Sequence, residues 1–405
     1  MIKKSFFRKN YIDKKNVNIN LLKKISKKFI KSKKEINKEI NSSRETLNIL
    51  SKNFKLNFKP KQFKVFKKYK TIAIIGMGGS ILGAEAVKNF FKRKIKKNIY
   101  FFNNLDPEYV SNFKKKENIQ KVLFLVISKS GNTIETLSNF FSLNIIKKNT
   151  KNIIIISEKS NNILYNVAQK FNLFFIEHKK NIGGRYSILS EVGIIPSYLM
   201  GLNINKLRQR IRDPLSKKNL TFLKESSLKL SSFIRSKKFN NIIFLNYAPE
   251  LDKFLFWCQQ LIAESLGKEK KGFFPTISTA PKDHHSLLQL YLDGPEDKLF
   301  YIFSASDVSV ERINLKKISS NAYYLNKKKL STIKNAQKNA LIQSLKKNKI
   351  PFREFKVNNI NEETLGELFS YFILETILVG KLTGLNPFNQ PAVEQVKIST
   401  KKILS

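Results

Sequence analysis

Cysteine and long apolar runs are nearly absent from this chain of 405 residues. Cys258 is the only cysteine, which excludes an internal disulfide and is typical of a reducing compartment, so we expect a cytoplasmic protein. The longest apolar runs, such as LFLVI at 123–127, fall far short of the roughly 20 residues that a membrane helix requires. The first residues also lack the apolar region of about 7 to 15 residues that marks a secretory signal. We therefore expect neither a membrane span nor secretion.

Acidic residues and arginine are also in short supply. The chain has 30 acidic against 76 basic side chains, a net charge of +46, and 10 of the basic residues are arginines. Such a charge is typical of nucleic-acid-binding proteins. The lysines, however, are spread along the whole chain and do not form one basic, arginine-rich face. We interpret the charge as a compositional bias and expect no specific nucleic-acid partner, only weak, salt-sensitive association with polyanions.

Histidine occurs three times. His178 ends an apolar run and has no cysteine or carboxylate pattern around it, so we expect no metal site. His284 and His285 follow Glu264 by about twenty residues. A carboxylate and an imidazole that lie near one another can transfer protons at neutral pH, which makes this stretch a candidate for acid–base chemistry.

The pattern of apolar residues predicts an α/β fold. Residues 1 to about 60 carry apolar side chains mostly at spacings of three, four and seven, which predicts a lysine-coated helical arm. Beyond residue 70, apolar runs of strand length alternate with segments long enough for helices, and this alternation predicts doubly wound parallel sheets. The predicted strands are 71–79, 99–103, 121–128, 152–157, 173–178, 241–247, 298–304 and 352–357. The predicted helices of the second half are 219–236, 251–266, 334–346 and 362–380.

Four segments follow from this alternation. We predict an N-terminal helical arm at 1–60, a first sheet domain at 61–205, a second sheet domain at 206–385 and a C-terminal segment at 386–405. The join between the two sheet domains falls in a polar, basic stretch that contains Pro214. Ligands of parallel sheets bind at the carboxyl ends of the strands, so these ends are the places to search for a site.

The first strand runs into a glycine-rich loop, Gly76–Gly83, whose glycines let the backbone approach a ligand where a helix begins. A dinucleotide fingerprint would place a third glycine where Ile81 stands, and an acidic residue where Asn103 closes the next strand. Both are missing. We therefore expect no nicotinamide cofactor, and no other cofactor is indicated.

A hydroxyl-rich loop follows the third strand. Ser128, Ser130 and Thr133 stand where a helix begins, and their hydroxyls together with free backbone N–H groups suit a phosphate dianion. An ordinary helix cap is the alternative, but it needs one such hydroxyl. Further on, Arg185 follows two glycines in an arginine-poor chain, which favours a need for its planar fork over a merely structural ion pair.

These motifs carry a family resemblance. The serine–threonine loop resembles that of the SIS (sugar isomerase) domain. The sequences GGRYS at 183–187, ESLGK at 264–268, HSLLQ at 285–289 and QPAVEQVK at 390–397 resemble the signatures of the phosphoglucose isomerase family, close to its short bacterial form. Ala392 stands where the family has a glycine, which puts the local backbone there in question. The resemblance spans residues 76–397 and implies two SIS-type domains.

The resemblance implies aldose–ketose isomerisation between glucose 6-phosphate and fructose 6-phosphate through a cis-enediolate, a step of glycolysis and gluconeogenesis. Glu264 is then the base that moves the carbon-bound proton, with a partly desolvated carboxylate. His285 and Lys397 are the acid–base groups of ring opening, and Arg185 offsets the charge of the enediolate. The family also implies a homodimer in which His285 reaches into the partner's site.

The resemblance also implies a set of substrate-binding residues. Glu135 is expected to orient Arg185 or Lys397. Gln390 stands where relatives that also accept mannose 6-phosphate have threonine, which favours a glucose-type enzyme. The full set is Gly79, Ser80, Ser128, Lys129, Ser130, Thr133, Glu135 and Gln390.

Two alternatives come from other classes. A SIS-type regulator would bind sugar phosphate without catalysis, but it has no use for Glu264, His285 and Lys397 together. A nucleic-acid-binding protein would account for the charge but for none of the motifs.

Overall fold

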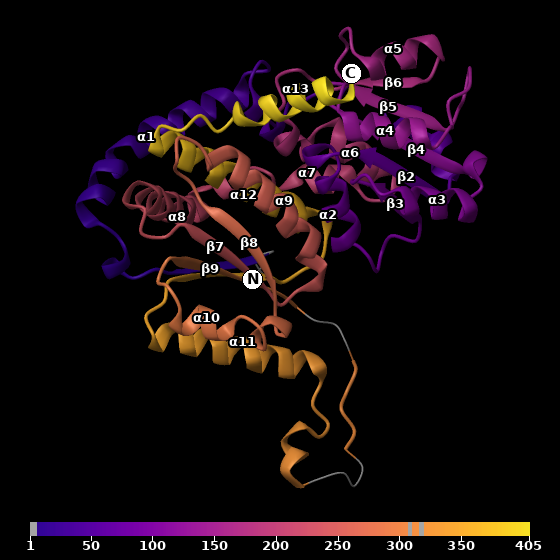
Figure 1. Ribbon diagram of the computed structural model, residues 1–405. Coiled ribbons are helices and arrows are strands. Elements are labelled where there is room, and N and C mark those ends of the chain that lie inside the picture. Colours follow the sequence, from indigo (N-terminus) through magenta and orange to yellow (C-terminus); the bar gives the residue numbers. More distant parts are fainter. Residues whose placement is uncertain (1–5, 307–309, 316–319) are drawn as a thin grey trace.

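The computed structural model describes residues 6–306, 310–315 and 320–405, and within them two parallel sheets form the body of the molecule (Figure 1). The first sheet has the strand order β3-β2-β4-β5-β6, and every pairing in it is parallel. Its strands are β2 (Thr71–Gly76), β3 (Asn98–Phe102), β4 (Val122–Ile127), β5 (Ile153–Ser157) and β6 (Phe174–Glu177). Its helices are α2 (Leu82–Phe90), α3 (Pro107–Lys116), α4 (Ile134–Ser142), α5 (Ile163–Lys170), α6 (Glu191–Leu199) and α7 (Ile204–Gln209).

The second sheet has the order β1-β10-β9-β7-β8. Its strands β7 (Asn241–Asn246), β8 (Phe274–Thr279), β9 (Lys298–Ala305) and β10 (Phe352–Val357) are parallel, and β1 (Phe6–Tyr11) joins β10 in the antiparallel direction. Its helices are α8 (Lys217–Ser236), α9 (Asp252–Leu266), α10 (Leu288–Asp293), α11 (Leu330–Lys347) and α12 (Glu362–Thr383). The strands and helices predicted for this half all occur, with ends shifted by a few residues.

Apolar side chains fill three layers. One core lies between the two sheets and includes α2, α6, α8, α9 and α12, with Ile74 from β2 and Tyr301 from β9. The outer face of the first sheet packs on α3, α4 and α5. The outer face of the second packs on α10 and α11. Because both faces of each sheet are covered, a central strand such as β4 is buried along its whole length, as its continuous apolar sequence requires.

The N-terminal segment differs in part from the prediction. Helix α1 (Ile19–Asn41) is present and buries the expected stripe, including Ile25 and Phe29. Residues 6–11, however, form strand β1 and not a helix. Pairing with β10 explains the difference, because it buries Phe6 at the sheet edge and brings the Asn10 side chain to Arg353, whose Nε donates to it at 3.1 Å. Tertiary pairing here overrides a local pattern.

Strand β8 also lies in a segment for which no strand was predicted. Its sequence FPTIST has few apolar residues, and Pro275 cannot donate a hydrogen bond to a neighbouring strand. The strand pairs with β7 alone and forms the edge of the sheet, where a proline is tolerated. The domain boundaries at 60, 205 and 385 stay predictions.

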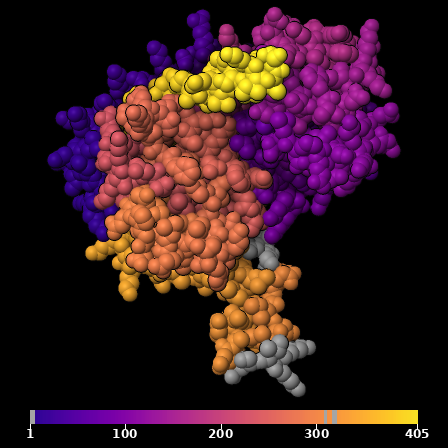
Figure 2. All heavy atoms as spheres, in the orientation of Figure 1, coloured from indigo at the N-terminus to yellow at the C-terminus, as the bar shows by residue number. Residues whose placement is uncertain are grey.

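The last helix, α13 (Ala392–Leu404), buries none of its residues and lies on the surface of the molecule (Figure 2). It follows α12 through a loop at 385–391, which returns to the interior between the two sheets. A membrane span is a separate matter: none of the helices described has the length and apolar character to cross a bilayer.

Candidate active site

The glycine loop after β2 packs directly on the turn that carries Arg185. A side-chain carbon on Gly79 would lie 2.2 Å from the carbonyl carbon of Gly184 and 2.4 Å from the backbone nitrogen of Arg185. No residue larger than glycine fits such an approach of two backbones. The hydroxyl of Ser187 donates to the carbonyl of Gly184 at 2.7 Å and closes the turn. The glycine at position 79 therefore fixes the place from which Arg185 enters the site.

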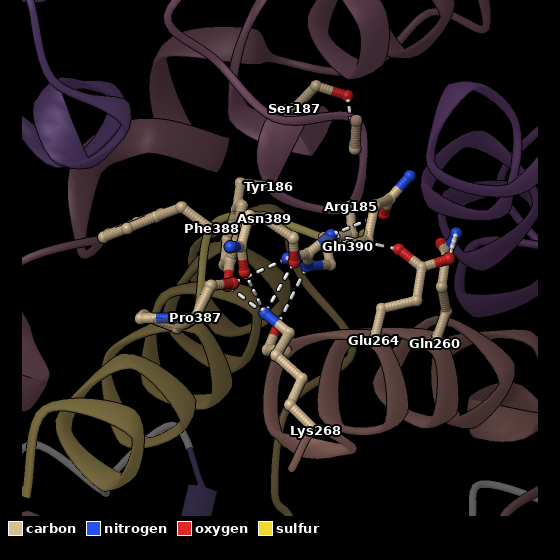
Figure 3. Close-up of polar contacts among 12 residues, drawn as sticks. Arg185, Tyr186, Ser187, Gln260, Glu264, Lys268, Pro387, Phe388, Asn389 and Gln390 are labelled. Atoms are coloured by element: carbon tan, nitrogen blue, oxygen red, sulfur yellow. Dashed lines mark hydrogen bonds and ion pairs between the residues drawn. The ribbon is translucent and has the colours of Figure 1, made fainter. Parts of the chain in front are cut away.

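Arg185 is the centre of the site. Its side chain is 3% exposed, and its guanidinium Nη1 donates to Glu264 Oε2 at 3.1 Å and to Gln390 Oε1 at 2.8 Å (Figure 3). Its Nε donates to the hydroxyl of Ser265 at 2.8 Å. Three residues that the sequence predicted for the site, from three distant segments, thus meet at one guanidinium. The nitrogens of the planar guanidinium donate to several side chains in fixed directions at once, and the single ammonium of a lysine could not reproduce this geometry.

The other arm of the guanidinium holds the C-terminal loop. Nη2 of Arg185 donates to the carbonyl oxygens of Pro387 at 2.6 Å and Asn389 at 3.2 Å. The hydroxyl of Tyr186 donates to the same Pro387 oxygen at 2.7 Å. The loop that leads to α13 is therefore fastened to the GGRYS turn through its backbone.

Glu264 lies in the last turn of α9 with both carboxylate oxygens oriented. Oε2 accepts from Arg185, and Oε1 accepts from the Gln260 amide at 2.9 Å, one helical turn earlier. The side chain keeps 30% of its surface exposed. A carboxylate held by a cation and an amide, yet open on one side, can accept a proton from a bound molecule in a fixed direction.

The hydroxyl-rich loop after β4 has the geometry of an anion site. Ser128 is buried, and its hydroxyl lies 2.9 Å from that of Thr133. Thr133 occupies the N-cap position of α4, but its side chain makes no capping hydrogen bond. Gly131 has a φ of +65°, and a side-chain carbon on it would lie 1.7 Å from Asn162 Oδ1. The first N–H groups of α4 are thus left without a side-chain cap, which suits a phosphate.

The other predicted binding residues of this region are placed in different ways. Ser80 is buried at the end of the glycine loop, and the hydroxyl of Ser130 accepts from the Asn132 N–H at 3.3 Å. Lys129 turns its ammonium to the carbonyl of Lys180 at 2.7 Å, and burial lowers its pKa. In this structure the Lys129 ammonium therefore holds the backbone of the segment that precedes the GGRYS turn.

Glu135, which the family resemblance expects to orient Arg185 or Lys397, has no hydrogen bond or ion pair with Arg185 among the residues that this structure describes. It lies in the first turn of α4, whereas Glu264 and Gln390 are the side chains that Arg185 Nη1 contacts. Within the described part of the chain, Glu135 also has no hydrogen bond or ion pair with Lys397. A carboxylate in the first turn of a helix is favoured by the helix dipole, and that accounts for its position.

His285 and Lys397 are not brought to Glu264 within this chain. His285 is exposed at the end of the short helix η9 (Lys282–His284), while its neighbour His284 forms a 2.6 Å hydrogen bond between Nε2 and the Tyr247 hydroxyl. Burial lowers the pKa of His284. Lys397 lies on α13 with its side chain 54% exposed and 3.3 Å from Glu394. Their roles stay predictions.

The sequence analysis missed several residues of α9 and the turn after it. Trp257 donates from its indole N–H to the carbonyl of Arg185 at 3.2 Å, and Gln260 and Ser265 contact the charged pair. Lys268 donates to the C-terminal loop, and its pKa is lowered to about 8, mainly by burial and then by Arg185. Gln260 precedes Glu264 by four residues on α9, and that spacing is the signal that places these two side chains together.

A hydroxyl-lined anion loop at the carboxyl end of a parallel sheet, together with a buried arginine that orients a carboxylate, supplies the parts that a sugar-phosphate isomerase requires. In the described ranges, no group of three or more His, Cys, Asp and Glu side chains could hold a metal ion.

Comparison with known proteins gives the particular family. The model of the family described as Phosphoglucose isomerase matches residues 7–405. The probable glucose-6-phosphate isomerase of Methanococcus maripaludis is 34% identical over 386 residues, which cover 92% of this chain and 86% of that protein. The glucose-6-phosphate isomerase of Methanocaldococcus jannaschii is 33% identical over 352 residues, 83% of this chain and 84% of that protein. The chain belongs to the phosphoglucose isomerase family, whose members are aldose–ketose isomerases.

The fold agrees. A crystal structure of a glucose-6-phosphate isomerase from Chlamydia trachomatis superimposes with a TM-score of 0.77 at 16% identity, covering 99% of this chain and 88% of that one. At such identity the likeness concerns the fold alone. The predicted class, two doubly wound parallel-sheet domains with helices at both ends of the chain, is confirmed, with β1 as an added antiparallel edge strand.

Proposed function

We propose that this chain interconverts glucose 6-phosphate and fructose 6-phosphate in the cytoplasm, as a step of glycolysis and gluconeogenesis. The observation that carries the proposal is the contact of Arg185 with both Glu264 and Gln390, next to the hydroxyl-rich loop. The names of the relatives from both methanogens support the substrate. Through this contact, Arg185 from the first half of the chain and Glu264 and Gln390 from the second half form one site.

The substrate's phosphate binds at the loop of Ser128 and Thr133, where hydroxyls and uncapped N–H groups of α4 face it. Glu264 takes the proton from C2 of the open-chain aldose. The electron pair left by that proton forms the C1–C2 double bond of the cis-enediolate while O1 gains negative charge. The hydroxyl proton of O2 passes to O1, which leaves the negative charge on O2. Glu264 then returns the carbon-bound proton to C1, and O2 becomes the carbonyl oxygen of the ketose.

Arg185 acts on the charge of the intermediate. Its guanidinium touches Glu264 in the free site and is buried, so it has little water to displace when the enediolate forms. A preorganised cation of this kind typically supplies several kcal/mol of transition-state stabilisation. Gln390 contributes by fixing Nη1 from the opposite side, and we assign it the preference for the glucose over the mannose epimer.

Ring opening requires proton transfer at O5 and O1, and we assign it to His285 and Lys397. His285 is exposed and, within the described residues, has no hydrogen bond or ion pair with Arg185, Glu264 or Gln390, which favours the family arrangement in which it enters the site of a second subunit. We therefore propose a homodimer. Phe274 on the edge strand β8 is also exposed, and a partner that covers this edge of the sheet would bury it.

A coupled assay tests the proposal. Purified protein is given fructose 6-phosphate, and formation of glucose 6-phosphate is followed with a glucose-6-phosphate dehydrogenase. If the protein is an isomerase, we expect turnover in the wild type and none in Glu264→Gln. A sugar-phosphate-binding regulator would bind fructose 6-phosphate in calorimetry without turnover, and that result would refute the assignment. Mannose 6-phosphate, supplied in place of fructose 6-phosphate, tests the role of Gln390.

A further inference from the structure

The loop at 386–390 is held by two cations from different elements. Arg185 donates hydrogen bonds to the carbonyl oxygens of Pro387 and Asn389, as described above. On its other side, the ammonium of Lys268 donates to the carbonyl of Asn386, to the carbonyl of Asn389 at 2.6 Å and to the side-chain oxygen of Asn389 at 2.9 Å (Figure 3). An ammonium has three donors, and Lys268 has three acceptors in this one loop.

Lys268 is set in place by the end of α9. Gly267 ends the helix, and its N–H donates to the carbonyl of Ala263 at 2.8 Å. Backbone bonds between Lys268 and Lys271 in both directions, at 3.1 and 2.9 Å, then close a tight turn. The base of the Lys268 side chain is therefore fixed one helical turn beyond Glu264. Helix α9 thus carries Glu264, and the turn directly after it carries Lys268, whose ammonium holds the 386–390 loop.

We propose that Lys268 is a positioning residue for the isomerase reaction: it fixes the 386–389 loop against the end of α9, and thereby holds Gln390 and Arg185 in register with Glu264. The proposal rests on the isomerase function. Without the ammonium, the carbonyls of Asn386 and Asn389 lose their donor, the loop moves away from α9, and the Gln390 amide is displaced from Arg185. The phosphate loop after β4 has no contact with Lys268 and keeps its geometry.

The abundance of lysine offers a simpler interpretation, in which Lys268 is one solvated lysine of many. Its contacts argue against that interpretation, because an exposed lysine keeps its ammonium in water, whereas this one donates to three oxygens of one loop. Lys271, three residues further on, shows the contrast. Its ammonium pairs with Glu269 in the same turn at 2.9 Å and, among the described residues, has no hydrogen bond or ion pair with the C-terminal loop.

The charge of Lys268 is also easier to lose than that of an ordinary lysine. Burial first, and Arg185 second, lower its pKa to about 8, while Glu264 opposes the shift. These two are the charged groups that face it from η6 (Gly184–Leu189) and α9, and the loop presents carbonyl and amide groups. As the pH rises through about 8, the ammonium becomes an amine with two donors in place of three. The hold on the loop then weakens.

The test compares Lys268→Met and Lys268→Arg with the control Lys271→Met. Lys268→Met is expected to lower kcat by roughly 10- to 100-fold while KM for fructose 6-phosphate stays within about threefold, because the loop is misplaced and the phosphate site is not. Lys268→Arg should recover part of kcat. The wild type should lose kcat above about pH 8, and Lys268→Arg should retain it to higher pH, because a guanidinium keeps its charge. Lys271→Met should match the wild type throughout.

A second measurement does not depend on activity. Hydrogen exchange of peptides that cover 385–391 should be faster in Lys268→Met than in the wild type and in Lys271→Met, while peptides of β4 are unchanged. Equal exchange in all three proteins would overturn the inference, as would a wild-type kcat and pH profile in Lys268→Met. Should the wild type show no turnover, the proposed function falls, and the exchange result still decides whether Lys268 holds the loop. If Lys268→Met does not fold, Lys268→Gln replaces it in both measurements.

Discussion

Glu264 is held at both oxygens, by Arg185 on one side and by Gln260 on the other. Such a carboxylate has lost the freedom to turn away from a bound sugar, and the orientation of its free lone pairs is set before the substrate arrives. A carboxylate that is held in this way and open on one side is suited to accept a proton from a bound molecule. Proton abstraction at C2 is the step for which this arrangement is suited.

Replacement of Glu264 by glutamine should therefore separate binding from chemistry. Glu264→Gln keeps the size of the side chain and leaves the loop of Ser128 and Thr133 intact, so KM should change by no more than a few-fold. The loss of the base should lower kcat by at least roughly 10² to 10⁴. NMR in deuterated water measures the exchange of the C2 proton directly. Exchange at more than about a tenth of the wild-type rate would contradict the assignment.

His178 gives a second prediction, for stability. It is buried, its Nδ1 lies 3.0 Å from the carbonyl of Lys179, and its Nε2 has no protein partner among the described residues. Burial lowers its pKa from 6.5 to about 4, with a further contribution from Lys129. The folded protein thus keeps this imidazole neutral below pH 6.5, whereas the unfolded chain takes up a proton there.

The sign follows from that difference. Stability from His178 is present above pH 6.5 and is lost as the pH falls from 6.5 toward 4. Between pH 7.5 and pH 5 the loss is about 2 kcal/mol, at about 1.4 kcal/mol per pKa unit. His178→Asn keeps a donor near Lys179 and does not titrate, so its unfolding free energy in urea should fall less over this interval than that of the wild type. Identical pH dependence in both proteins would count against a neutral buried His178.

At the scale of the elements, the glycine loop and the GGRYS turn form one packed unit. Gly79→Ala should force the two backbones apart, because the added methyl would lie 2.2 Å from Gly184. Gly184→Ala is the matched control, since the nearest atom to its added methyl is 4.0 Å away. We expect Gly79→Ala to lower the melting temperature by several degrees, equivalent to about 1–3 kcal/mol. Gly184→Ala should melt close to the wild type; equal melting of both variants would refute the packing argument.

The elements also show what the sequence could predict. Buried parallel strands such as β4 and β5 are continuous apolar runs, and their pattern is visible without tertiary information. Strands β1 and β8 are not visible in this way, because the sequence of β1 is half polar and that of β8 has few apolar residues and a proline. The edge strands β3 and β6 of the first sheet, which are richer in apolar residues, were predicted. A local pattern therefore identifies a strand by its apolar sequence and misses strands whose place is set by pairing.

Some contacts of the site could likewise be predicted from the sequence, and others could not. Arg185, Glu264 and Gln390 were assigned to one site through family motifs, and the structure brings them into contact although they lie up to 205 positions apart in the chain. No local pattern contains a contact of that separation. Lys268 was missed because its role depends on carbonyl groups, which leave no mark on the sequence. The role expected for Glu135, to orient Arg185 or Lys397, stays a prediction, since Arg185 contacts Glu264 and Gln390 in this structure.

At the scale of the whole molecule, one chain does not bring together all the groups that we propose for the reaction. Arg185 and Glu264 meet within the chain, but His285 is exposed on the second domain. Lys397 is likewise exposed, on a helix that buries none of its residues. A two-fold dimer would place the same surface of each chain against the other and could complete both sites at once.

The trans arrangement predicts rescue between two inactive variants. Homodimers of Glu264→Gln and of His285→Ala should each be inactive, because each lacks one group in both sites. In a mixed dimer, one site combines an intact Glu264 with the partner subunit's intact His285, and the other site carries both lesions. Random pairing gives about half mixed dimers, so co-expression should restore about a quarter of the wild-type sites. If His285 acted within its own chain, every site of a mixed dimer would carry one lesion. Mixed dimers that are verified by mass and remain inactive would therefore refute the trans role of His285 and leave the base assignment of Glu264 intact.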